Sequence, residues 1–153
     1  MEDCVFCKII KGEIPSTKVY EDDNVLAFKD INPAAPVHIL VVPKQHIENV
    51  LELNENNKKI ASEIFLAINK IAKQLGIDKN GFRVITNCGK DAGQEVMHLH
   101  FHILAGGKMG PKIVWHKKED KVLGKENKIW YNKRNMILYY RRKRWAKENM
   151  EKY

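Results

Sequence analysis

The clearest pattern of apolar and polar positions lies in residues 54–75. Apolar residues recur there every three or four positions, which places their side chains on one face of an α-helix. These residues are Ile60, Ile64, Ile68, Ile71 and Leu75. Gly76 follows them as a suitable C′ residue. The pattern predicts one long helix that turns this apolar face towards a core.

Shorter apolar segments on both sides of this helix are typical of β-strands. They cover residues 17–20, 25–29, 37–43, 81–88 and 97–104. A brief helix over residues 5–10 comes first and ends before Gly12 and Pro15. Hairpins thus precede the long helix, and two strands follow it. This order predicts an α+β fold with a largely antiparallel sheet rather than repeated βαβ units.

Histidine and apolar residues alternate strictly along the last predicted strand. Neighbouring side chains in a strand point to opposite faces, so His98, His100 and His102 are expected to share one face. The outer two would lie roughly 13 Å apart along the strand, too far to bind the same small atom. Metal ligation and simple surface exposure are alternatives. Three aligned histidines after a Gly-Gln pair nevertheless favour a functional site in which the histidines divide the work.

Further short motifs accompany these histidines. They are Phe28-Lys29-Asp30-Ile31-Asn32-Pro33, Pro36-Val37-His38, Pro43-Lys44-Gln45-His46 and Gly93-Gln94, together with Phe6, Ile9, Ile10 and Asn87. With His98-Leu99-His100-Phe101-His102-Ile103 they resemble the histidine triad (HIT) family of nucleotide hydrolases and transferases, in particular its Hint-like branch of purine nucleoside phosphoramidases. The resemblance covers about residues 3–106. It implies a HIT domain over residues 1–106 with a five-stranded sheet, and a homodimer whose sheets run together across the interface.

The resemblance also implies a set of catalytic residues. His100 would be the nucleophile that attacks the α-phosphorus of a nucleoside 5′-phosphoramidate or anhydride, and water would then release the nucleotide from it. His102 would hydrogen-bond the phosphate or the bridging atom, where charge develops. His38 would lie at the same phosphate end. The expected product is a nucleoside monophosphate, with purines preferred.

A second set of residues is expected to bind the rest of the nucleotide. Asp30 would accept hydrogen bonds from the ribose hydroxyls. The other members are Phe6, Ile9, Phe28 and Ile31 around the base, and Asn87 and Gln94 as donors to phosphate oxygens. No Walker loop is present, and a substrate of this kind needs none.

Glu95 departs from the pattern of the well-studied phosphoramidases, which carry a serine at this place. That hydroxyl helps to protonate the leaving amine. Glu95 would do so only if it is protonated or acts through water. An exposed carboxylate at the rim of the site is the alternative reading, and either way Glu95 is expected beside the nucleotide.

Cys4 and Cys7 form a Cys-x-x-Cys motif near the N-terminus. A redox pair is one reading, but no thioredoxin-like βαβ unit surrounds it. Zinc takes four nitrogen or sulfur ligands in tetrahedral geometry, and His46 and His98 are the natural remaining two. Similar HIT proteins bind zinc with such a set, which implies that His98 is structural. Two small buried hydrophobic side chains are the alternative reading.

Composition divides the chain into a near-neutral body and a basic extension. Residues 1–106 carry a charge balance of −2, whereas residues 107–153 carry +10 and all three tryptophans. No apolar run reaches the length of about 18 residues that a membrane span needs. The start of the chain has no signal-peptide pattern, and there are three cysteines, so a reducing cytoplasmic setting is expected.

The extension allows two readings. Basic residues interleaved with aromatic ones are typical of single-stranded nucleic acid binding. A solvated helical face whose aromatic residues pack on the body or on a second subunit is the alternative, and it is the one we favour. In either case the sequence predicts that residues 107–153 form a separate C-terminal extension with helical segments.

The sequence thus predicts a nucleotide hydrolase that acts through a nucleotidyl-histidine intermediate, with structural zinc and no organic cofactor. A dinucleoside polyphosphate hydrolase is a rival within the class. A nucleotide- or nucleic-acid-binding interaction protein is a rival outside it. The intact row of histidines argues for an enzyme, because binding alone does not require aligned imidazoles.

Overall fold

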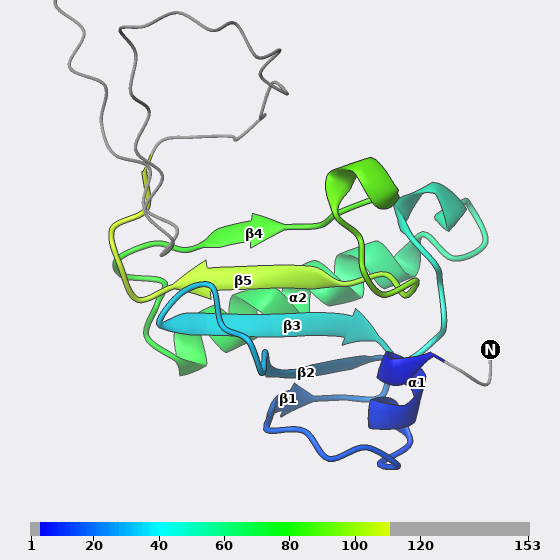
Figure 1. Ribbon diagram of the computed structural model, residues 1–153, viewed down its shortest axis with the longest axis horizontal. Helices are drawn as coiled ribbons and strands as arrows, with labels where there is room; N and C mark the ends of the chain where they lie inside the picture. Colours follow the sequence, from blue (N-terminus) through cyan, green and yellow to red (C-terminus); the bar gives the residue numbers. More distant parts are fainter. Residues whose placement is uncertain (1–3, 111–153) are drawn as a thin grey trace, which may run out of the picture. The chain divides into compact units, whose positions relative to one another are not determined.

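The computed structural model describes residues 4–110, so most of the predicted C-terminal extension lies outside the described residues. The described part belongs to one compact unit (Figure 1). Its elements, in order, are α1 (Val5–Ile10), β1 (Lys18–Glu21), β2 (Val25–Lys29), β3 (Val37–Pro43), the short 3-10 helix η1 (Val50–Glu52), α2 (Lys59–Gln74), β4 (Arg83–Ile85), the 3-10 helix η2 (Lys90–Ala92) and β5 (Phe101–Ala105). None of the helices in this part is long and apolar enough to cross a membrane.

The strands form one antiparallel sheet in the order β1-β2-β3-β5-β4, as Figure 1 shows. The predicted α+β fold and five-stranded sheet are therefore confirmed. β3 lies at the centre and pairs with β2 on one side and β5 on the other, and its apolar run is buried in the cores on the two faces of the sheet. In the β3–β5 register Leu40 faces His102, which places His38 diagonally beside His102 on the same face.

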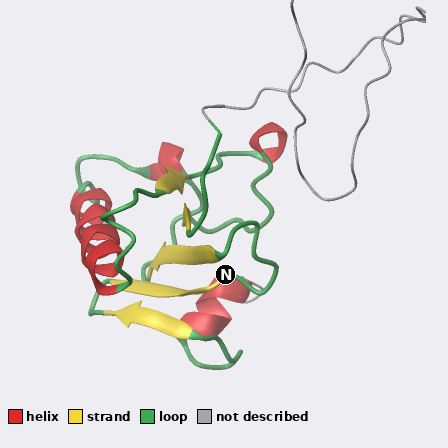
Figure 2. Cartoon of the chain, turned by 90° about the vertical axis from the view of Figure 1, so that its left-hand side faces the viewer, coloured by secondary structure: helices red, strands yellow, loops and turns green. Residues whose placement is uncertain are grey.

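The two faces of the sheet carry different helices (Figure 2). α2 packs on one face through the predicted stripe, in which Ile64, Ile68 and Ile71 are buried in the larger core. α1 covers part of the other face, where Phe6 and Ile9 form a smaller core. The strand residues of this smaller core are Leu26, Phe28, Leu40 and Val42. The sheet therefore leaves the rest of its α1 face available for a site.

The long helix is shorter than predicted at both ends. Residues 54–57 form a turn instead, in which the backbone N–H of Asn54 donates to the Asn57 side chain over 2.7 Å. Asparagine side chains compete with the helix for backbone groups in this way. Leu75 follows the last helical residue and is 39% exposed, so it does not belong to the buried stripe. Gly76 has the positive φ of 66° expected of a C′ glycine.

The last two strands are also shorter than predicted. The backbone N–H of Leu99 donates to the Ile47 carbonyl over 2.6 Å, in the loop after β3, so residues 97–100 do not join the sheet. β4 keeps only three residues of the predicted 81–88 segment. The first strand is displaced by one residue, to Lys18–Glu21. Local apolar patterns showed where strands lie, but not where loop contacts replace ladder pairing.

Candidate active site

The alternation predicted for the histidine segment is kept although only His102 lies within β5. Leu99, Phe101 and Ile103 are buried in the α2-side core. The rings of His100 and His102 lie on the opposite side, with their centroids 5.0 Å apart. The division between an apolar face and an imidazole face therefore holds even where the chain leaves the ladder.

A cleft of about 950 Å³ opens on this side of the sheet. His100 and His102 line it, with Asp30, Asn87 and Glu95 among the other predicted residues. The apolar part of its lining consists of Val5, Phe6, Ile9, Ile14, Pro15, Phe28, Ile31, Leu40 and Val96. The cleft thus joins an apolar compartment to a group of polar and ionisable side chains, as expected of a small-molecule site.

His100 has its tautomer fixed by the neighbouring backbone. Its Nδ1 lies 2.6 Å from the carbonyl oxygen of His98. A carbonyl oxygen can only accept, so Nδ1 carries a hydrogen, and in the neutral ring it is Nε2 that holds the lone pair. The ring is buried and meets the Phe6 ring edge to face at 5.3 Å. The His98 carbonyl therefore fixes the orientation of the His100 ring at the cleft, with Nε2 as the nitrogen that can act as a nucleophile.

His38 and His102 form a directed pair. The Ala34 backbone N–H donates to His38 Nδ1 over 3.1 Å, so the His38 hydrogen resides on Nε2. That Nε2 lies 2.9 Å from His102 Nδ1 and 3.4 Å from an Asp30 carboxylate oxygen. His102 Nδ1 accepts from His38 and leaves its own Nε2–H as a donor. His38 does not line the cleft. It orients the His102 ring through the hydrogen bond to His102 Nδ1.

Burial lowers the pKa of His102 to about 4. The nearby imidazoles of His100 and His38 act in the same direction, and Asp30 opposes them. His102 is therefore neutral near pH 7 and presents a hydrogen-bond donor rather than a charge.

Asp30 follows β2 and lines the cleft next to the apolar compartment. One carboxylate oxygen accepts from the Asn32 backbone N–H over 2.7 Å, and the other faces His38. Of the apolar residues predicted around the base, Phe6, Ile9 and Phe28 are buried, whereas Ile31 is 91% exposed. Ile31 therefore contributes to the edge of the cleft rather than to a closed wall.

Gln94 takes a different place from the one expected. Its amide nitrogen donates to the carbonyls of Glu48 and Val96, over 2.7 and 3.1 Å, and its amide oxygen accepts from Gly89. These bonds use both amide hydrogens, and Gln94 is buried rather than part of the cleft lining. Its structural role is to fix the loop that carries Glu95.

Several lining residues were missed by the sequence analysis: Val5, Ile14, Pro15, Ser16, Thr17, Lys29, Asn32, Leu40, Gly93 and Val96. Leu40 could have been predicted, because it lies two residues after His38 in β3 and residues two apart in a strand share a face. The segment from Ile14 to Thr17 carried none, since it is an irregular connection between α1 and β1.

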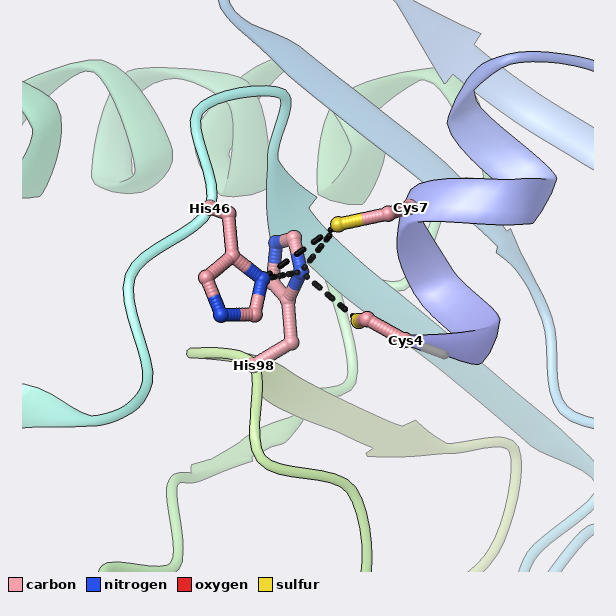
Figure 3. Close-up of side chains that lie close together, drawn as sticks. All are labelled: Cys4, Cys7, His46 and His98. Carbon is pink, nitrogen blue, oxygen red and sulfur yellow. Dashed lines mark hydrogen bonds between the residues drawn. The ribbon is translucent and has the colours of Figure 1, made fainter. Parts of the chain in front are cut away.

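Cys4, Cys7, His46 and His98 meet at the junction of α1 with the loops after β3 and before β5 (Figure 3). Their ligand atoms all lie within 4.8 Å of one another. His98 Nδ1 lies 3.4 Å from Cys4 Sγ, 3.6 Å from Cys7 Sγ and 3.3 Å from His46 Nδ1, and Cys7 Sγ lies 3.3 Å from His46 Nδ1.

These distances match a tetrahedral zinc centre. Typical zinc bonds place a sulfur and a nitrogen ligand about 3.6 Å apart, and two nitrogen ligands about 3.3 Å apart. His98 Nε2 also lies 2.9 Å from the Pro43 carbonyl and must donate to it, which leaves Nδ1 free to bind a metal. Burial lowers the pKa of His98, so its ring is neutral as a ligand should be. The four residues therefore fit zinc.

Comparison with known proteins was decisive for the family. The profile of the HIT domain family matches residues 11–109. The chain belongs to the HIT family. A HIT family hydrolase from Clostridium thermocellum is 61% identical, with a TM-score of 0.73, over 74% of this chain and 99% of that one.

Two further relatives show how widely this HIT domain is shared. An uncharacterised HIT-like protein of Buchnera aphidicola is 52% identical over 105 residues, which are 69% of this chain and 94% of that protein. The purine nucleoside phosphoramidase of Escherichia coli K12 is 43% identical over 112 residues, which are 73% of this chain and 94% of that protein.

Proposed function

We propose that this HIT protein hydrolyses nucleoside 5′-phosphoramidates or phosphoanhydrides and releases a nucleoside monophosphate, with purines preferred. The observation that carries the proposal is the fixed tautomer of His100, whose Nε2 lone pair is held at the cleft by the His98 carbonyl. The relationship to a purine nucleoside phosphoramidase supports the same conclusion.

The reaction runs in two steps. His100 Nε2 attacks the α-phosphorus, and the bond from phosphorus to the leaving group breaks with its electron pair on that group, which takes a proton from solvent. Water then hydrolyses the nucleotidyl-His100 adduct, which restores the imidazole and returns the proton. The His102 Nε2–H hydrogen-bonds the phosphate or the bridging atom while charge develops there. His38 holds His102 in that orientation.

The nucleoside half fits the other end of the cleft. Phe6, Ile9 and Phe28 offer apolar surface to a base. Asp30 lines the same cleft, with a carboxylate oxygen 3.4 Å from His38 Nε2, and would accept hydrogen bonds from ribose hydroxyls. One cleft thus offers groups suited to the base, the ribose and the α-phosphate.

A substrate panel tests the proposal. Adenosine phosphoramidate, adenylylated amino acids and diadenosine tetraphosphate are each assayed with the natural protein and with His100→Asn. The proposal requires turnover that the substitution reduces by several orders of magnitude. Preferential cleavage of diadenosine tetraphosphate would instead favour the polyphosphate hydrolase, and binding without turnover would favour an interaction protein.

We also propose that Cys4, Cys7, His46 and His98 bind a structural zinc ion. The supporting observation is the agreement of their mutual distances with tetrahedral coordination. Zinc there would tie α1, and with it Phe6 and Ile9, to the loop that holds His98. It is given no part in the chemical step.

A homodimer is proposed as well. Among the described residues β4 pairs only with β5, so one edge of this strand is open to a partner. Phe65 and Leu66 on α2 are 56% and 63% exposed, which is unusual for large apolar side chains side by side. Sedimentation of Leu66→Lys beside the natural protein tests the interface, because burying that lysine would shift the protein towards monomer.

A further inference from the structure

Glu95 is presented to the cleft from a fixed backbone. Gln94 before it is tied to three backbone groups, and Val96 after it packs against the core under α1. Glu95 itself is exposed and lines the cleft together with His100 and His102. Its position relative to the nucleophile is therefore set by the fold and not by a loose loop.

The two carboxylates that line the cleft differ in their partners. Asp30 accepts from the Asn32 backbone and faces His38. No hydrogen bond or ion pair within residues 4–110 involves Glu95. Its negative charge is consequently available to a ligand.

The roles proposed for the other lining residues indicate which part of a substrate meets Glu95. Phe6, Phe28 and Asp30 receive the nucleoside from the side of α1 and β2, and the two histidines receive the α-phosphate. The substituent on the other side of phosphorus then extends towards the remaining wall. The lining residues nearest in sequence to the histidine segment, among them Gly93 and Glu95, are therefore the ones that we expect this substituent to meet.

We propose that Glu95 selects substrates whose leaving amine carries a positive charge a few bonds from the scissile P–N bond. This inference rests on the proposed function. A carboxylate beside an anionic phosphate repels it, and a cation in the leaving group offsets that repulsion. A polyphosphate leaving group adds negative charge at the same place, so the same residue disfavours dinucleoside polyphosphates.

Three adenosine 5′-phosphoramidates of similar size test the inference. Their amines are 1,3-diaminopropane, butylamine and β-alanine, which give a cationic, a neutral and an anionic leaving group at pH 7. Exposed charge pairs change free energies modestly, so kcat/KM for the cationic substrate should exceed that for the neutral one by about two- to fivefold. Added salt should reduce this ratio.

Glu95→Gln should bring the cationic-to-neutral ratio close to one, and Glu95→Lys should invert the order. The matched control is Asp91→Asn, since Asp91 is an acidic residue of the same loop region on η2 that does not line the cleft. That variant should keep the natural ratio. Because each ratio is taken within one variant, a general loss of activity does not distort it.

The outcomes separate this inference from the function beneath it. Turnover that depends on His100 but shows equal kcat/KM for all three substrates overturns the role of Glu95 alone. If Glu95→Gln keeps the cationic-to-neutral ratio of kcat/KM of the natural protein, the role of Glu95 is likewise overturned. No turnover of any of the three substrates overturns the proposed hydrolysis of phosphoramidates together with this inference.

Discussion

At the scale of single residues, the site depends on which nitrogen of each imidazole carries hydrogen. Three backbone groups decide this: the carbonyls of His98 and Pro43 and the N–H of Ala34. The sequence predicted which histidines matter and which face they share. It could not predict these tautomers, nor that the Gln94 amide hydrogen-bonds to backbone groups, because both depend on loop geometry that has no periodic signal in the sequence.

His102 should remain neutral well below the usual range of histidine. Its pKa is lowered to about 4 by burial, against 6.5 ordinarily. Between those pH values the unfolded chain binds more protons, so the contribution of His102 to stability is complete above pH 6.5 and is lost as pH falls towards 4. Nitrogen-15 NMR should find the Nε2–H tautomer at pH 5.5. A His102 signal that titrates near 6.5 would contradict the buried pair with His38.

Asp30 should set a preference for ribose. Asp30→Asn keeps an oxygen for the Asn32 N–H but removes the charge that ribose hydroxyls would meet. A paired polar contact contributes about 1 kcal/mol, so the ribose-to-deoxyribose ratio of kcat/KM should fall roughly fivefold. Parallel assays of adenosine and 2′-deoxyadenosine phosphoramidates measure it. An unchanged ratio would remove Asp30 from ribose binding.

At the scale of elements, α1 connects the proposed zinc centre with the nucleotide cleft. Cys4 and Cys7 flank Phe6, whose ring touches those of both His98 and His100. The Cys-x-x-Cys spacing and the helix were predicted from sequence. The ring contacts that connect the proposed zinc centre to the nucleophile were not, since they depend on how α1 crosses the sheet.

Cys7→Ser should therefore lower both the zinc content and the thermal stability of the protein. Elemental analysis should find about one zinc per chain in the natural protein and less in the variant, with a lower Tm. In a domain of this size a loss of 1 kcal/mol lowers Tm by about 4–8 °C. Cys88→Ser is the control, because Cys88 lies outside the ligand set. Equal stability and equally low zinc in all three proteins would show that the cysteines serve packing alone.

At the scale of the whole molecule, charge is distributed unevenly. The sequence predicted the α+β fold and its antiparallel sheet well, because the core follows regular alternation and helical periodicity. Residues 107–153, with a balance of +10 against −2 before them, lack such regularity, and their predicted bracing or nucleic-acid role lies outside the described residues.

Shortening the chain after Gly110 separates these two roles. That end point keeps the hydrogen bond from Arg83 to the Gly110 carbonyl. The bracing role, which we favour, predicts a lower Tm or a shift towards monomer in analytical ultracentrifugation, with no change in background binding to single-stranded DNA. Loss of a salt-sensitive DNA affinity, with dimer and Tm unchanged, would instead establish the nucleic-acid role.

The central claim is that His100 carries the nucleotide during turnover. Mass spectrometry of a reaction with adenosine phosphoramidate, quenched in alkali within the first turnover, tests it most directly. The mechanism predicts one adenylyl group on the peptide that contains His100, and none in His100→Asn. An unmodified His100 in a protein that hydrolyses the substrate, or full activity in His100→Asn, would contradict it.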